Sequence, residues 1–140
     1  MSRVLAVKTL VVAALVLVAG CGGGDKFDRQ AISGTASMDG RLIPYGNIEF
    51  VPADGQPTSV SVEIKDGKFA MDKKGGLAPG KYVVRVQGFD RPLPPPTGDT
   101  EAPLANYPKV IVPEKFNSAS KETVEVKVGD KNEFTLALKK

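Results

Sequence analysis

Few side chains in this sequence belong to the types that catalyse reactions or bind metals. Histidine is absent and cysteine occurs once, at Cys21. Histidine-based acid–base catalysis, zinc sites of histidine and cysteine, Ser-His-Asp or Cys-His arrangements and internal disulfides are therefore excluded. The acidic pairs Asp25 with Asp28 and Asp99 with Glu101 lack the spacing of a calcium-binding loop. We expect no metal, no cofactor and no catalytic residue; the one nucleophilic arrangement left open is a Ser or Thr hydroxyl activated by a Lys amine.

The segment before Cys21 has the pattern of an export signal. Arg3 and Lys8 make its start basic, and the twelve residues from position 9 to position 20 carry no charge. A transmembrane helix needs about 20 apolar residues, so this run is too short to cross a bilayer. It has the length of the apolar region in a secretory signal peptide. We predict that residues 1–20 are a signal peptide that is removed on export.

The cysteine that follows this segment is the candidate site of a modification. Val18, Ala19, Gly20 and Cys21 resemble the bacterial lipobox, in which small residues precede a cysteine that is lipidated and becomes the mature N-terminus. Cys21 could instead be a small buried apolar residue, but a single thiol in an exported chain has no disulfide partner. Three acyl chains, as in bacterial lipoproteins, give lasting attachment. We expect membrane lipid to be a partner through acylated Cys21.

The residues after the anchor define the expected location and charge. Residues 21–29 are predicted to be a lipidated, flexible tether, and residues 30–140 the folded domain. Gly22 follows the cysteine in place of Asp, which favours the outer membrane, or a periplasm-facing position, within the cell envelope. Without residues 1–20 the chain has 17 basic and 16 acidic residues, which alternate along the chain. This balance argues against nucleic acid as a partner.

The remaining sequence is predicted to be all-β. From position 30 onward apolar and polar residues alternate with a period of two, and Gly, Pro and Asp-Gly interrupt them about every 8–12 residues. This spacing is typical of a β-sandwich with Greek-key connections and seven or eight strands. Phe50 and Leu136 are expected in the core, whereas Glu63 is expected on the surface.

Turn residues predict which strands are neighbours. Asp39-Gly40 and Asp66-Gly67 supply the positive φ angles of tight hairpin turns. Gly129-Asp130 is predicted to close a last hairpin. Its two strands would place Val124, Val126 and Val128 opposite Phe134, Leu136 and Leu138, and a further short strand is predicted at Val110 and Val112.

The longest loop, residues 91–103, is rich in proline. Its Arg-Pro-Leu-Pro-Pro-Pro start favours an extended polyproline conformation. We interpret it as a stiff loop that crosses between sheets, although aromatic grooves of other proteins bind segments of this kind. A long loop in a compact domain is also where binding residues concentrate.

Several motifs in order along the chain resemble one family. Ser-Gly-Thr-Ala and Asp-Gly-Arg-Leu-Ile-Pro are followed by Asn-Ile-Glu-Phe-Val-Pro, and Leu-Ala-Pro-Gly-Lys-Tyr comes later. Together they resemble the carboxypeptidase regulatory-like domain, a transthyretin-like (prealbumin-like) sandwich found in small bacterial lipoproteins. The segments that carry the resemblance are 33–36, 39–44, 47–52, 66–69, 77–86, 113–117 and 124–138.

The resemblance implies little chemistry. In carboxypeptidases such a domain is non-catalytic, and in surface proteins its relatives are spacers or binding modules. The branch that hydrolyses 5-hydroxyisourate relies on histidines and a Tyr-Arg-Gly-Ser ending, whereas this chain has no histidine and ends in Leu-Lys-Lys. We therefore expect an envelope lipoprotein whose sandwich is a structural or binding module, with an envelope protein or a glycan as its further partner. The alternative is a hydrolase that uses a Ser/Thr-Lys arrangement.

Overall fold

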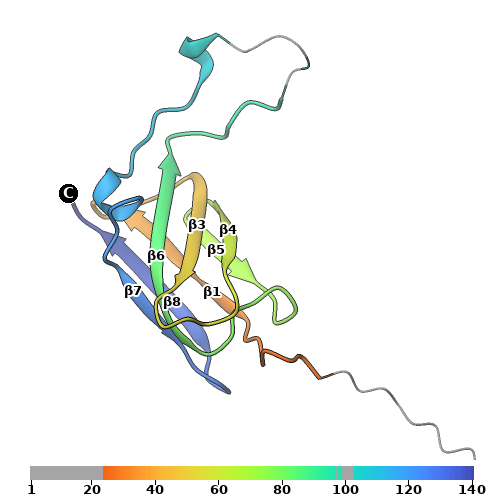
Figure 1. The fold of residues 1–140 in the computed structure, drawn as a ribbon. Helices are drawn as coiled ribbons and strands as arrows, with labels where there is room; N and C mark the ends of the chain where they lie inside the picture. The colour runs from red at the N-terminus through yellow and green to blue at the C-terminus, as the bar shows by residue number, and fades with distance from the viewer. Residues whose placement is uncertain (1–23, 97, 99–102) are drawn as a thin grey trace, which may run out of the picture.

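The computed structural model describes residues 24–96, 98 and 103–140 (Figure 1). Nearly all of its regular structure is β-strand, as the alternating sequence predicted. Within the described part, no helix is long and apolar enough to cross a membrane. The elements are β1 Ile32–Met38, β2 Arg41–Leu42, β3 Tyr45–Pro52, β4 Val60–Lys65, β5 Lys68–Met71, β6 Gly80–Phe89, the short 3-10 helices η1 Leu104–Asn106 and η2 Glu114–Phe116, β7 Thr123–Val126 and β8 Asn132–Leu138.

The strands form one curled, mainly antiparallel sheet. Its hydrogen-bonded order is β2-β1-β5-β4-β3-β6-β7. In addition, β8 pairs with β1 along its whole length, whereas β5 pairs with the first part of β1 and β2 with its last two residues. The strand pair β4–β5 in the middle of this order is joined at a single register position, Lys65 opposite Lys68. One half of this order, β4-β3-β6-β7, and the other half, β5-β1-β8, both contribute side chains to one buried core.

The two predicted Asp-Gly turns are confirmed. Asp39 and Gly40 have φ angles of 49° and 79°, and Asp66 and Gly67 have 51° and 74°, as in the left-handed turns that connect tight hairpins. The second turn differs from a simple hairpin in one respect. Moving away from the turn, β4 and β5 separate beyond the pair Lys65–Lys68. There β4 pairs with β3, and β5 pairs with β1.

The prediction that Gly129-Asp130 closes a hairpin between the last two strands is wrong. β7 pairs with β6 in antiparallel fashion, and β8 pairs with β1 in parallel along all seven of its residues. The side chain of Asn132 explains why the chain leaves β7 here, since its Oδ1 accepts from the Lys127 N–H (2.9 Å) and its Nδ2 donates to the Lys127 carbonyl (3.0 Å). These bonds replace the strand ladder at that point. Val128 is 59% exposed instead of in the core.

The predicted short strand at Val110 and Val112 is also reduced. Val110 forms only an isolated bridge with Phe89, and its side chain is exposed. Val112 is buried as predicted. The chain forms a single bridge to β6 at Val110 and then leaves the sheet towards η2.

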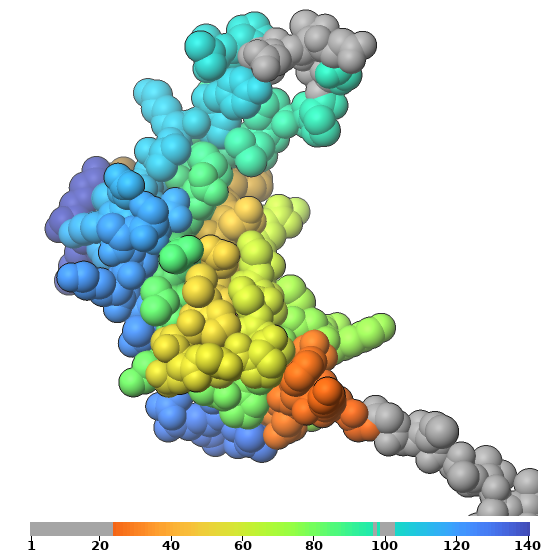
Figure 2. Space-filling view, viewed as in Figure 1, coloured from red at the N-terminus to blue at the C-terminus, as the bar shows by residue number. Residues whose placement is uncertain are grey.

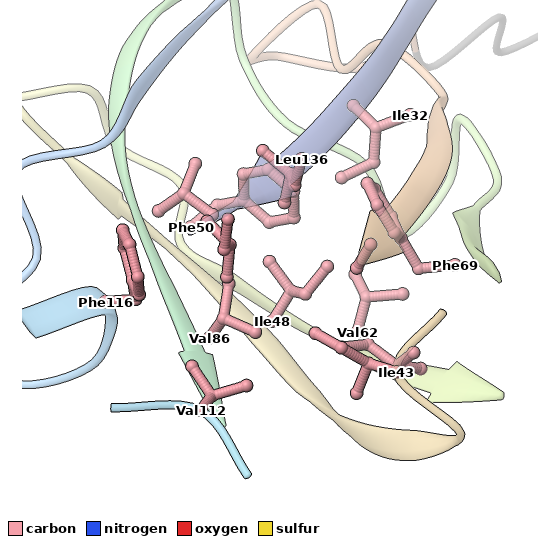
Figure 3. Packing of buried hydrophobic residues seen from close by; sticks show 14 of the residues in the cluster. Ile32, Ile43, Ile48, Phe50, Val62, Phe69, Val86, Val112, Phe116 and Leu136 are labelled. Atoms are coloured by element: carbon pink, nitrogen blue, oxygen red, sulfur yellow. The ribbon is translucent and has the colours of Figure 1, made fainter. Parts of the chain in front are cut away.

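The core has the alternating apolar residues that the sequence indicated. Ile48 and Phe50 of β3 are fully buried, and Leu136 of β8 is 7% exposed. The Phe50 ring lies 6.1 Å from the Phe69 ring and 6.3 Å from the Phe134 ring, centroid to centroid. Side chains of both halves of the sheet therefore meet around Phe50 (Figure 3).

A closed ring of hydrogen bonds lies at the start of β6. The Ala78 N–H donates to Thr58 Oγ1 (2.8 Å), the Thr58 and Tyr82 hydroxyls are 2.9 Å apart, and the Tyr82 hydroxyl donates to the Ala78 carbonyl (2.8 Å). All three residues are buried. Burial raises the pKa of Tyr82 above 10.0, and the hydrogen bond with Thr58 partly offsets this. The ring fastens the segment before β6 to the segment before β4.

Candidate binding groove

The residues predicted to form the lipidation site, Val18, Ala19, Gly20 and Cys21, lie outside the described residues. The described chain begins at Gly24 and forms a hydrogen-bonded turn. The Asp25 carboxylate accepts from the N–H groups of Phe27 (3.1 Å) and Arg29 (2.7 Å) and from the Arg29 guanidinium (3.0 Å).

This turn has an electrostatic consequence and a geometric one. The Arg29 N–H in particular lowers the pKa of Asp25 below 3.8, because it stabilises the ionised carboxylate. After the turn, Gln30 forms a bridge with Leu77, shortly before β6 begins. The chain therefore joins the sheet at the end where β6 starts.

The outward face of β4, β3 and β6 has three rows of side chains that the sequence analysis did not identify as a site. Strand register sets these rows, because β3 pairs with β4 on one side and with β6 on the other. In an antiparallel sheet such partners lie about 4.5–5.5 Å apart. The rows are Lys65–Tyr45–Phe89, Glu63–Asn47–Gln87 and Ser61–Glu49–Arg85.

A groove of about 610 Å³ lies over the first two of these rows. Tyr45 and Phe89, both half-buried, form its aromatic part, and Asn47 and Glu63 contribute polar groups to its floor. Pro92 and Leu93, from the loop after β6, line it as well, and Leu93 is 57% exposed. The groove thus combines apolar and polar surface in the volume range of ligand sites.

A smaller hollow of about 160 Å³ continues the groove along the same face. It shares Asn47 and Ser61 with the larger groove and extends to Arg85. The Arg85 guanidinium lies 3.7 Å from the Glu49 carboxylate, with both side chains partly exposed. This charge pair forms the far end of the floor.

The loop that lines the groove is held at its base. The Asp90 N–H donates to the Lys109 carbonyl (3.1 Å), and the Lys109 N–H donates to the Asp90 carboxylate (2.8 Å). The Arg91 guanidinium donates to the Tyr107 carbonyl (3.0 Å). These bonds close the base of a projecting arm, whose described residues are 90–96, 98 and 103–110, so Pro92 and Leu93 are positioned next to Phe89.

The arm and the N-terminal segment leave the domain at opposite ends. Figure 2 shows the described part of the arm projecting from one end and residues 24–29 at the other. Pro92 and Leu93, which belong to the 91–103 loop where the sequence analysis expects binding residues to concentrate, line the groove. The strand residues beneath them were missed, since the alternation that predicts an outward face does not say which rows face each other.

Pairs of hydroxyl and amine groups occur on the surface without the environment that a nucleophile needs. Thr35 and Lys68 are register partners, and Ser61 and Lys65 line the same groove. Both lysine side chains are exposed to solvent. In addition, no cluster of three or more Cys, Asp or Glu side chains is placed to hold a metal in the part of the chain that the structure describes.

Compared with protein families, curated proteins and solved structures, the chain matches none. The assignment of a function therefore depends on the geometry of the groove and on the sequence of residues 1–21.

Proposed function

We propose that this chain is a lipid-anchored protein of the bacterial cell envelope whose non-catalytic β-domain binds a ligand in the groove on the outward face of β3, β4 and β6. Residues 1–20 are the signal peptide, Cys21 is acylated, and residues 21–29 connect the lipid to the domain at residues 30–140. The location that Gly22 favours is the outer membrane.

The observation that carries this proposal is the position of the groove relative to the N-terminal attachment. The described chain joins the sheet next to Leu77, before β6 starts, whereas the groove lies at Phe89, where β6 ends. Ten residues of strand at about 3.3 Å each separate the two ends by roughly 30 Å. A domain anchored at Cys21 therefore presents the groove away from its attachment point.

We also propose that the curled sheet is a Greek-key sandwich of the transthyretin-like kind. Two features support this. Among the described strands, the halves of the sheet are joined by one register pair, Lys65 opposite Lys68, and Tyr82 hydrogen-bonds to the carbonyl four residues before it. The second feature has the form of the tyrosine corner of β-sandwiches. The motif resemblance to carboxypeptidase regulatory-like domains agrees with both.

The hydrolase alternative has weaker support. A lysine that activates a hydroxyl must be desolvated so that it is neutral at physiological pH. Lys68, the register partner of Thr35, and Lys65, which lines the same groove as Ser61, are exposed. We therefore propose a binding role for the groove.

Intact-mass measurement on protein extracted from membranes of the producing bacterium tests the anchor. We expect a chain that starts at Cys21 and carries acyl groups, and we expect the Cys21→Ala variant to lack this mass increment. An unprocessed chain that starts at Met1, or a membrane-bound chain with a free Cys21 thiol, would contradict the proposal.

A further inference from the structure

We propose that the groove binds a neutral oligosaccharide, which is an inference that rests on the binding function proposed above. Three properties of the described residues support this ligand class: a pair of aromatic side chains in one row, a floor of polar groups, and balanced charge.

The aromatic pair provides an apolar surface for a sugar ring. Tyr45 and Phe89 are register partners on adjacent antiparallel strands, and both line the groove. Their exposed ring surfaces extend the apolar surface of Pro92 and Leu93. The C–H faces of a pyranose ring are apolar, whereas its edges carry hydroxyls. Such a ring can pack one face on the aromatic pair and leave its hydroxyls directed to the sides.

The polar floor can satisfy those hydroxyls. A sugar hydroxyl both donates and accepts, and it is best matched by groups that together do the same. The Asn47 amide and the Ser61 hydroxyl donate and accept, the Glu63 carboxylate accepts, and the Lys65 ammonium donates. Within the described chain these four side chains make no hydrogen bond to other protein groups, so they are available to a ligand.

The charge of the groove favours a neutral ligand over an ionic one. Glu63 and Lys65 contribute one charge of each sign, and Glu49 and Arg85 neutralise each other at 3.7 Å. A phosphate or uronate ligand would meet no excess of positive charge, unlike in sites that recognise anions through arginine or lysine clusters.

The strand pairing argues against an extended peptide as the ligand. A peptide gains affinity from a sheet mainly by adding to a free edge. β3, at the centre of the floor, is already paired on both sides, with β4 and β6. At β3 the groove therefore offers a ligand side-chain contacts but no free strand edge to which a peptide backbone could hydrogen-bond.

Calorimetric titration of the full chain tests the inference. The protein is kept in a detergent without a sugar head group, and the probes are chitotetraose, cellotetraose and maltotetraose. Tetragalacturonate serves as the charged counterpart. We expect at least one neutral tetrasaccharide to bind and tetragalacturonate to bind at least about tenfold more weakly, a difference of roughly 1.4 kcal/mol.

Variants locate the binding. We expect Tyr45→Ala and Phe89→Ala each to weaken it about tenfold or more, and Tyr45→Phe, which keeps the ring, to change it less than about threefold. Val128→Ala removes an exposed apolar side chain near the opposite end of the sheet and is expected to have no effect. Circular dichroism confirms that each variant folds.

Three results would overturn the inference. The first is that no neutral tetrasaccharide binds, the second is that tetragalacturonate binds as tightly as the neutral ligands, and the third is that binding survives unchanged in both folded alanine variants. If Cys21 proves to be acylated while no sugar binds, the lipid-anchored role stands and the oligosaccharide is rejected. If sugar binds to a chain that is not acylated, the anchor is rejected and the ligand class stands.

Discussion

Replacing Tyr82 by Phe tests how much the hydrogen-bonded ring before β6 contributes to stability. The substitution removes one oxygen atom and keeps the buried aromatic ring, so little packing is lost. It breaks the bond to the Thr58 hydroxyl and the bond to the Ala78 carbonyl, both buried.

The expected loss in the free energy of unfolding follows from these two bonds. A buried hydrogen bond contributes about 1 kcal/mol net, and a buried group left without a partner costs about 1–3 kcal/mol. Tyr82→Phe leaves the Thr58 hydroxyl and the Ala78 carbonyl without this partner. We therefore expect a loss of about 2–3 kcal/mol.

Urea unfolding followed by circular dichroism measures this loss. The matched control is Tyr45→Phe, whose hydroxyl makes no hydrogen bond to the protein within the described residues; we expect less than about 0.5 kcal/mol. Thr58→Val completes a double-variant cycle. Because the Thr58–Tyr82 bond is broken in both single variants, the double variant should lose about 1 kcal/mol less than their sum.

A loss below about 0.5 kcal/mol for Tyr82→Phe would refute this reasoning. So would strict additivity in the cycle, since it would mean that the two hydroxyls do not interact.

Three further predictions concern the core, a glycine and pH. Phe50→Ala is expected to cost about 3–5 kcal/mol and Glu63→Ala less than about 0.5 kcal/mol in urea unfolding; equal costs would contradict the assigned core. Gly34→Ala places a Cβ against a carbonyl oxygen of β8, so we expect a loss of at least about 3 kcal/mol, whereas Gly24→Ala, with open space around it, should unfold like the parent. Because burial raises the pKa of Tyr82, its contribution to stability is complete below about pH 10 and is lost as the pH rises further. Above that pH the parent should therefore lose stability more steeply than Tyr82→Phe, and parallel pH profiles would contradict this.

The features that the sequence predicted correctly are local ones. Asp39-Gly40 and Asp66-Gly67 form turns because their residue types tolerate positive φ angles, whatever the rest of the chain does. The burial of Phe50 and Leu136 follows from period-two alternation within single strands.

The features that the sequence did not predict depend on contacts between distant segments. β8 pairs in parallel with β1, more than ninety positions away along the chain, and the Asn132 side chain replaces the expected hairpin bonds. The groove requires the register of three strands and the closure of the arm by Asp90 and Lys109. Neither the parallel pairing of β8 with β1 nor the groove can be predicted from the spacing of residues along one strand.

Site-specific photocrosslinking in the native envelope tests most directly whether the groove is the ligand site of an anchored protein. The photoreactive residue p-benzoylphenylalanine replaces Leu93 at the groove or Val128 near the opposite end of the sheet, and adducts are identified by mass spectrometry. We predict a defined adduct from position 93, lost when Phe89→Ala is introduced, and none from position 128. Equal adduct yields from both positions, or no adduct from position 93, would contradict the account.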